Sequence, residues 1–179
     1  FEPMEGVLIR YPFGISYQII AEMSEDVEVI TIVSSQSQAN YVESLYEANG
    51  VDTDNTSYLI ALSDSHWTRD YGPWFIFSGN NELEVIDFTY NRPRPNDNNI
   101  PSAFANDQDL TYYKMPLTHA GGNYMTDGQG IAISTDLVWS ENSGLTHEQI
   151  NDIMNEYCGI ETYHVVQDAL GEYIKHIDC

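Results

Sequence analysis

The chain has 179 residues, enough for one sizeable core, since a typical domain holds roughly 100–150 residues. It carries 28 acidic residues against 6 basic ones, which gives a formal net charge of −22. A polyanion of this kind repels nucleic acid and anionic membranes, so both are excluded as default partners. The acidic residues are dispersed and 12% of the chain is aromatic, which indicates a folded domain rather than a disordered acidic tail.

The sequence also bears on the compartment. No apolar run approaches the roughly 20 residues that cross a bilayer. The first residues, Phe1 to Glu5, contain neither the basic nor the apolar region of a signal peptide. Cys158 and Cys179 do not have the spacing of a metal site, and the sequence alone does not pair them in a disulfide. The acidic composition slightly favours a secreted protein.

Strand and helix signals alternate along the chain. Residues 7–11 and 27–33 are rich in β-branched side chains and bounded by turns, so both are predicted to be buried strands. A serine with glutamine three residues later forms a capping box and predicts a helix over residues 35–50, which ends on a glycine. A threonine and a glutamine predict a second helix over residues 146–159 in the same way.

Two predicted hairpins indicate a weak repeat. The first joins residues 74–77 to 83–88, and the second joins 123–126 to 131–135. Each is followed by a helical pattern and another strand. Because a unit of strand, strand, helix and strand cannot bury its own sheet alone, we expect the units to pack as blades around an axis. The expected fold class is α/β.

The segment Trp67-Thr68-Arg69-Asp70-Tyr71-Gly72-Pro73 is the most informative part of the chain. A neighbouring arginine and aspartate usually serve structure, with the arginine holding a loop and the aspartate capping a turn. The flanking aromatic residues and a second acid downstream favour another interpretation. A flat guanidinium group binds carboxylates at its edge and an aromatic ring on its face.

The second acid lies near the end of the chain, in the sequence His176-Ile177-Asp178. We predict a strand here, in which alternation places His176 and Asp178 on one face and Cys179 on the other. Such a pair suits a general acid or base next to a cation-binding carboxylate. The alternative is a histidine satisfied by its surroundings near a surface acid. The spacing indicates no third ligand, so no metal site is predicted.

Two other segments have unusual composition. In the loop over residues 91–99, Arg92 and Arg94 alternate with Pro93 and Pro95, and two cations on a stiff loop could clamp a carboxylate. Neutralisation of local acids explains them equally well. Gly121-Gly122 permits a close backbone approach, and Asp127-Gly128 is typical of a hairpin turn.

These segments resemble one family. Residues 67–73, 121–128 and 176–178 follow the order of motifs in the bacterial peptidylarginine deiminase and agmatine deiminase family. The resemblance covers essentially the whole chain, and residues 91–97 and 171–174 are similar to the secreted Porphyromonas type in particular. It implies the pentein fold, a five-bladed α/β propeller of ββαβ units. About three blades would lie in residues 1–179, as part of a catalytic domain in a secreted or periplasmic bacterial protein.

The resemblance implies roles for three of the residues. Asp70 and Asp178 would hold the guanidinium nitrogens, and His176 would transfer protons. In the family, a cysteine thiolate attacks the guanidinium carbon, ammonia leaves, and water hydrolyses the thiouronium to citrulline. This reaction needs no cofactor.

Substrate recognition is implied for four more residues. Trp67 and Tyr173 would flank the aliphatic stem of an arginine, and Arg92 with Arg94 would bind the free carboxylate of a C-terminal arginine. The expected partner is therefore an arginine-containing peptide or a small guanidino compound.

Two departures from the family bear on activity. The family's nucleophile lies well beyond its His-x-Asp, whereas this chain ends at Cys179, which we expect to face away from His176. We therefore expect an N-terminal part of a deiminase without turnover of its own and with blade edges open to self-association. Ala120 replaces an acid that agmatine deiminases usually carry before the two glycines, which favours peptidyl arginine. The alternatives are an agmatine or free-arginine deiminase of polyamine synthesis, or a non-catalytic module that binds arginine peptides.

Overall fold

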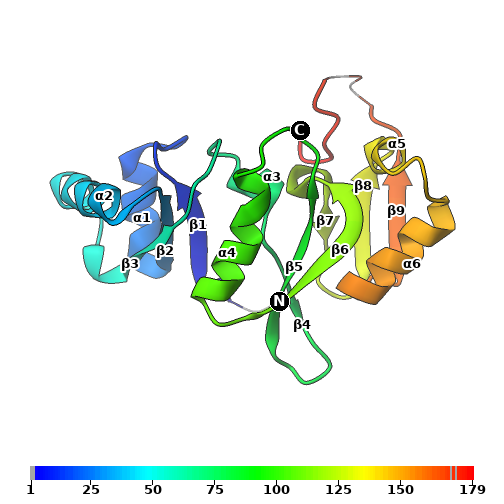
Figure 1. The fold of residues 1–179 in the computed structure, drawn as a ribbon, viewed down its shortest axis with the longest axis horizontal. Coiled ribbons are helices and arrows are strands. Elements are labelled where there is room, and N and C mark those ends of the chain that lie inside the picture. Colours follow the sequence, from blue (N-terminus) through cyan, green and yellow to red (C-terminus); the bar gives the residue numbers. More distant parts are fainter. Residues whose placement is uncertain (1–2, 170, 172) are drawn as a thin grey trace.

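The computed structural model describes residues 3–169, 171 and 173–179. Three small three-stranded sheets stand side by side, each with its own helices, and follow one another along the chain (Figure 1). This arrangement confirms the predicted α/β class. No helix in the described part is long and apolar enough to span a membrane.

The first blade contains only parallel strands. Its elements are β1 (Gly6–Arg10), α1 (Tyr17–Asp26), β2 (Glu28–Val33), α2 (Gln36–Ala48), a 3₁₀ turn (Thr53–Asn55) and β3 (Thr56–Ile60). The sheet order is β1-β2-β3, and both pairings are parallel. The strands predicted at 7–11 and 27–33 and the helix predicted from residue 35 are confirmed. Helical crossovers link the strands because parallel neighbours cannot be joined by a tight hairpin.

The other two blades follow the predicted ββαβ order. The second contains α3 (Thr68–Tyr71), β4 (Trp74–Phe77), β5 (Leu83–Tyr90), a 3₁₀ turn (Asp97–Asn99), α4 (Ile100–Asp107) and β6 (Thr111–His119). The third contains η3 (Gly121–Asn123), β7 (Met125–Thr126), β8 (Ile131–Thr135), α5 (Leu137–Glu141), α6 (His147–Cys158) and β9 (Thr162–Val166). In each blade an antiparallel hairpin is followed by a parallel third strand, which confirms both hairpins.

Apolar side chains join neighbouring blades. One core cluster combines Ile32 and Leu59 of the first blade with Tyr71 and Ile100 of the second. Another cluster combines side chains of the second and third blades, namely Trp74, Ile86, Phe88, Met115, Leu117, Ala132, Val138, Ile150 and Met154. Because these side chains leave water only when the blades pack together, their burial fixes the blades relative to one another.

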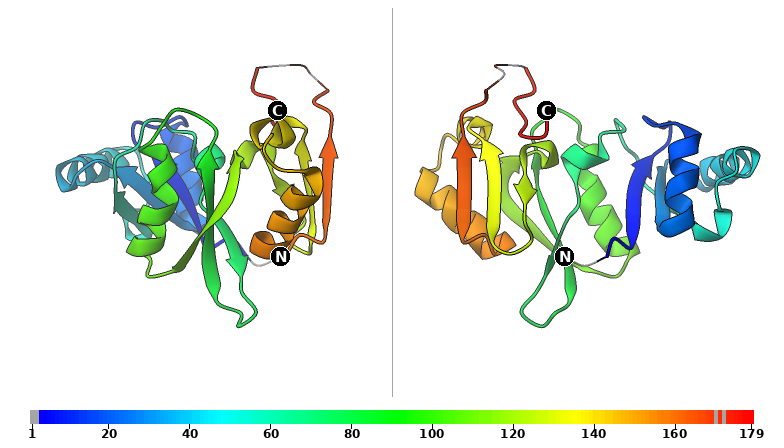
Figure 2. Two further views of the ribbon diagram at one scale, coloured as in Figure 1. Left: turned by 45° about the vertical axis from the view of Figure 1, so that its right-hand side comes forward. Right: turned by 180° about the vertical axis from the view of Figure 1, so that it is seen from behind.

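The loops that follow the parallel strands gather at one end of the molecule. The arrowheads of β5 and β9 point towards the end at which the C-terminus lies, opposite the N-terminus (Figure 1). The view from behind shows the last segment leaving β9 and turning back to lie between the second and third blades (Figure 2). Segments far apart in the sequence therefore meet at this end.

The strand predicted at the C-terminus is wrong. Residues 171 and 173–179 form bends and turns without strand pairing. Lys175 has a φ of 58°, a left-handed conformation that breaks an extended chain. Its carbonyl accepts a hydrogen bond from Thr135 Oγ1 (2.5 Å), and Asp178 N donates to Gly122 O (3.2 Å). These bonds to the third blade outweigh the local preference for a strand.

The same turn corrects the orientation expected for Cys179. Strand alternation placed its thiol away from the charged pair, but Cys179 Sγ lies 3.8 Å from Asp178 Oδ1. A residue in a turn does not obey the two-residue period of a strand.

The capping box at Thr146 offers a test of helix stability. Thr146 Oγ1 accepts from Gln149 N (3.2 Å), and Gln149 Oε1 accepts from Thr146 N (2.8 Å). We expect Thr146→Ala to lower the free energy of unfolding by about 1 kcal/mol, measured by urea denaturation. Ser143→Ala, in the exposed loop before the helix, is the control and should change little. Equal stability of the two variants would contradict the role of the cap.

Candidate active site

Three charged side chains from distant parts of the chain meet around Gly122. A methyl group built on Gly122 would lie 2.5 Å from His176 Nδ1, 2.6 Å from Asp70 Oδ1 and 3.1 Å from Asp178 Oδ1. The three atoms therefore surround one point, and only a glycine leaves room for them. The sequence led us to expect two carboxylates and an imidazole in one place, and the structure brings them together.

Asp70 is presented by the single helical turn α3. Its backbone N donates to Trp67 O (2.9 Å), which closes the turn. A methyl group on Gly121 would collide with the backbone carbonyl of Arg69, so this glycine lets α3 pack directly on the turn η3. The close approach expected at the two glycines is therefore observed.

The imidazole is the most buried of the three groups. His176 Nδ1 lies 3.4 Å from Asp70 Oδ1, and the His176 side chain is only 3% exposed. Its Nε2 is buried without a hydrogen-bond partner among the residues that the structure describes. Asp178 is more open, and its Oδ2 lies 3.8 Å from Arg69 Nε. Two carboxylates flanking a buried imidazole create a site that favours a cation.

A buried carboxylate organises the arginine-containing loop. Asp97 is fully buried and accepts hydrogen bonds from Asp64 N (2.6 Å), Ser65 N (3.1 Å) and Ser65 Oγ (2.6 Å). Arg94 Nη1 donates to Ser65 Oγ (3.2 Å) and to Tyr90 Oη (3.3 Å). Part of the Arg94 guanidinium therefore supports the loop through two hydroxyl groups, whereas the alternative proposed from the sequence was neutralisation of local acids.

Arg92 lies on the same side of the molecule as the acidic group. Its guanidinium carbon is 5.7 Å from the centre of the Tyr173 ring, while Tyr173 itself is 90% exposed. Burial raises the pKa of Tyr90, Asp70 raises it further, and Arg94 and Arg92 lower it. The Tyr90 hydroxyl thus experiences the charges of Asp70 and of both arginines.

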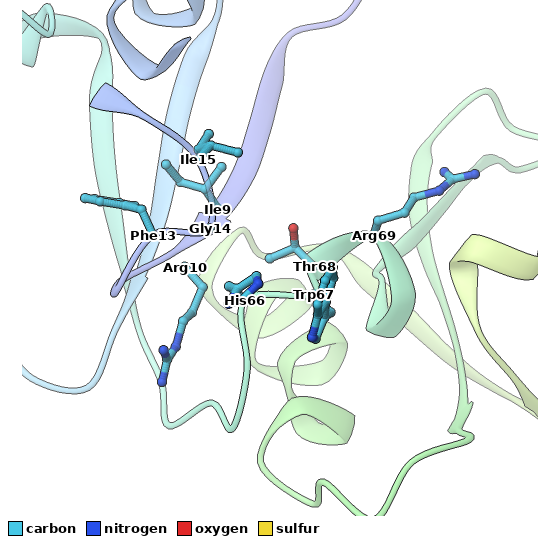
Figure 3. Close-up of a pocket in the computed structure, with 9 residues that line it drawn as sticks. All are labelled: Ile9, Arg10, Phe13, Gly14, Ile15, His66, Trp67, Thr68 and Arg69. Atoms are coloured by element: carbon cyan, nitrogen blue, oxygen red, sulfur yellow. The ribbon is translucent and has the colours of Figure 1, made fainter. Parts of the chain in front are cut away.

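Trp67 borders a hollow on the first-blade side. The hollow has a volume of about 270 Å³, and apolar side chains of Ile9, Phe13 and Ile15 line it with Trp67 (Figure 3). Trp67 is 50% exposed. Arg69 also belongs to the lining, but its side chain extends away from the other labelled residues (Figure 3). The structure therefore places Trp67 beside this apolar hollow, and its contact with a substrate stays a prediction.

Two further titratable residues stand near the site without a motif to reveal them. His119 is fully buried, and desolvation lowers its pKa to about 4, so its ring is neutral at pH 7. Its Nε2 lies 3.2 Å from Tyr163 Oη. Glu141 is half-buried and accepts a hydrogen bond from Asn91 Nδ2 (2.7 Å). Neither residue is part of a sequence motif, so the sequence analysis missed both.

Within the described ranges, no group of three or more His, Cys, Asp or Glu side chains is arranged to hold a metal ion.

Comparison with known proteins identifies the family. The family profile of the Porphyromonas-type peptidyl-arginine deiminases matches residues 15–179. The chain belongs to this family. A putative agmatine deiminase of Mycoplasma capricolum is 26% identical over 159 residues, which cover 82% of this chain and 42% of that protein.

Solved deiminase structures share the fold. An agmatine deiminase of C. jejuni with substrate bound has a TM-score of 0.75 at 20% identity, covering 92% of this chain and 53% of that one. A putative arginine deiminase of Porphyromonas gingivalis has a TM-score of 0.75 at 16% identity, covering 93% and 55%. This deiminase-family chain therefore spans about half the length of the relatives it matches. The resemblance inferred from the motifs and the pentein-type fold are both confirmed.

Proposed function

We propose that the site around Gly122 binds the guanidinium group of a substrate for hydrolytic deimination. The observation that carries the proposal is the convergence of Asp70 and Asp178 with His176 on one point. A planar cation between two carboxylates can form charge-assisted hydrogen bonds along both edges. Membership in a family of guanidino-group deiminases supports the same chemistry.

The proposed reaction converts a guanidinium and water into a ureido group and ammonia. A thiolate forms a bond to the guanidinium carbon, the C–N bond to the departing ammonia breaks with proton transfer from His176, and water then cleaves the thiouronium. Burial raises the pKa of Cys158 to about 12, so this thiol is poorly suited to the attack. We infer that these residues form the substrate-binding part of a catalytic domain, which in the matched relatives is about twice as long as this chain.

Peptides that end in arginine are the proposed substrate class. Arg92 and Arg94 act on the pKa of Tyr90 together with Asp70, and a free carboxylate is the chemistry that two guanidinium groups recognise. Ala120, which is fully buried, leaves no acid before the two glycines. We expect the isolated chain to bind such peptides without deiminating them.

Agmatine is the second candidate substrate, and the names of the relatives favour it. The M. capricolum protein is described as a putative agmatine deiminase, and the C. jejuni enzyme is an agmatine deiminase. Agmatine carries the guanidinium but no carboxylate, so Arg92 and Arg94 would have no group to bind.

Calorimetry with three ligands tests the proposal. We expect a short peptide ending in arginine to bind about tenfold more tightly as the free acid than as the amide, because one charged hydrogen-bonding group is removed. Arg92→Gln should reduce this preference, because only the Arg94 guanidinium is left to bind the carboxylate. Agmatine binding as tightly as the free acid would favour the second candidate, and no binding of any ligand would contradict both. Citrulline release, assayed in parallel, is expected to be absent from the 179-residue chain.

A further inference from the structure

Glu141 reaches across from the third blade to the start of the arginine-containing loop. It is the last residue of α5, and its Oε1 accepts a hydrogen bond from Asn91 Nδ2 (2.7 Å). Asn91 directly precedes Arg92, and its backbone N donates to His119 O (3.1 Å), extending the pairing of β5 with β6. The Asn91–Glu141 hydrogen bond therefore connects two blades at the residue next to Arg92.

The position of Glu141 is fixed by its neighbour Asn142. The Asn142 side chain is buried and donates to Thr118 O (2.9 Å) and Val138 O (2.8 Å), while its Oδ1 accepts from Thr118 N (2.8 Å). These bonds tie the end of α5 to β6. Because its backbone is held in this way, Glu141 provides a rigid acceptor rather than a mobile surface acid.

The loop is then held at two points, with Arg92 between them. Asp97 fixes one end through its three hydrogen bonds to residues 64 and 65, and Glu141 fixes the other through Asn91. Burial raises the pKa of Glu141, whereas the Asn91 bond and the charges of Arg92 and His176 lower it. The Glu141 carboxylate thus combines a direct hydrogen bond to Asn91 with electrostatic attraction to Arg92.

We propose that Glu141 is a positioning residue for substrate selectivity. Acting through Asn91, it holds Arg92 at the separation from the Gly122 site that fits a substrate with both a guanidinium and a terminal carboxylate. This inference rests on the proposed function and goes one step further, because it names the residue on which the preference for a free carboxylate depends. Glu141 does not touch the substrate in this scheme.

The test compares affinities for the free-acid and amidated forms of one arginine-terminated peptide. We expect Glu141→Ala to reduce the acid-to-amide affinity ratio about fivefold, because Arg92 loses its support. Glu141→Gln retains an acceptor for Asn91 and should keep the wild-type ratio or exceed it. Asn91→Ala should reproduce the effect of Glu141→Ala, and the double variant should lose no more than either single one. A loss of folded protein would weaken both affinities and leave the ratio unchanged.

Several outcomes would overturn the inference while leaving the proposed function intact. These are a wild-type ratio in Glu141→Ala, an equal loss in Glu141→Gln, or additive effects of Asn91→Ala and Glu141→Ala. A wild-type protein that binds arginine peptides without any preference for the free acid would overturn the carboxylate clamp itself.

Amide hydrogen exchange measures the support of the loop without a ligand. Arg94 N donates to Arg92 O (2.8 Å), and Asn98 N donates to Arg94 O (3.1 Å). Both amides should exchange faster in Glu141→Ala than in Glu141→Gln. Equal exchange in the two variants would show that Glu141 does not hold the loop.

Discussion

Gly122→Ala is expected to weaken the binding of arginine-terminated peptides by about 30-fold or more, because disturbing close charged contacts costs about 2 kcal/mol or more. The added methyl group would lie within 3.1 Å of the Asp70, Asp178 and His176 side chains, so all three must move apart. The measurement is titration calorimetry of the purified variant, with circular dichroism to establish that it is folded.

Two other glycines provide the controls for this substitution. A methyl group on Gly144 would meet no atom within 4 Å, so Gly144→Ala should bind as the wild type does. At Gly121 the obstacle is the Arg69 backbone carbonyl, so Gly121→Ala is expected to destabilise the fold as well as the site. Wild-type affinity in a folded Gly122→Ala variant would show that the three charged groups are not the binding site.

Asp70→Asn is expected to weaken the same peptides by about 30-fold or more, since removal of one charge from a close ion pair costs about 2 kcal/mol or more. The substitution conserves shape and removes the negative charge that faces both His176 and the proposed guanidinium. Asp178→Asn should act in the same direction, with a smaller loss because its side chain is 34% exposed and more strongly screened by water.

Asp152→Asn is the matched control for charge, because Asp152 is exposed on α6 and the exchange is chemically identical. It should leave affinity unchanged at moderate ionic strength. If Asp152→Asn weakened binding as much as Asp70→Asn, the general negative field of the protein would account for the attraction, and a specific pocket would not be needed.

The elements that could be predicted from the sequence are those stabilised by residues close together in the chain. The helix from residue 147 begins with the expected reciprocal hydrogen bonds between Thr146 and Gln149, because the partners are three residues apart. Gly159 ends it with a φ of 66°, the left-handed conformation expected there. At Ser35 only half of the box forms, since Gln38 Oε1 accepts from Ser34 N instead. A sequence pattern cannot tell which of two neighbouring backbone amides, Ser34 N or Ser35 N, the glutamine side chain will bind.

The features that could not be predicted depend on partners far away in the sequence. The terminal segment has an apolar and polar alternation typical of a strand, but Thr135 and Gly122 hold it as a turn. Asp97 is the best example of a hidden anchor, because its three donors lie more than thirty residues upstream. Glu141 and Asn91 are fifty positions apart and belong to no motif.

The sequence by itself determined which residue types would be assembled: two carboxylates, an imidazole, a pair of glycines and an arginine pair, on an α/β repeat. These follow from short-range patterns and from the order of motifs along the chain. Only the tertiary structure decided how they meet, through a turn at Lys175 rather than a strand and with Glu141 hydrogen-bonded to Asn91, the residue before Arg92. The reason is physical. Packing between blades and hydrogen bonds between distant residues contribute more free energy than the conformational preference of any short segment.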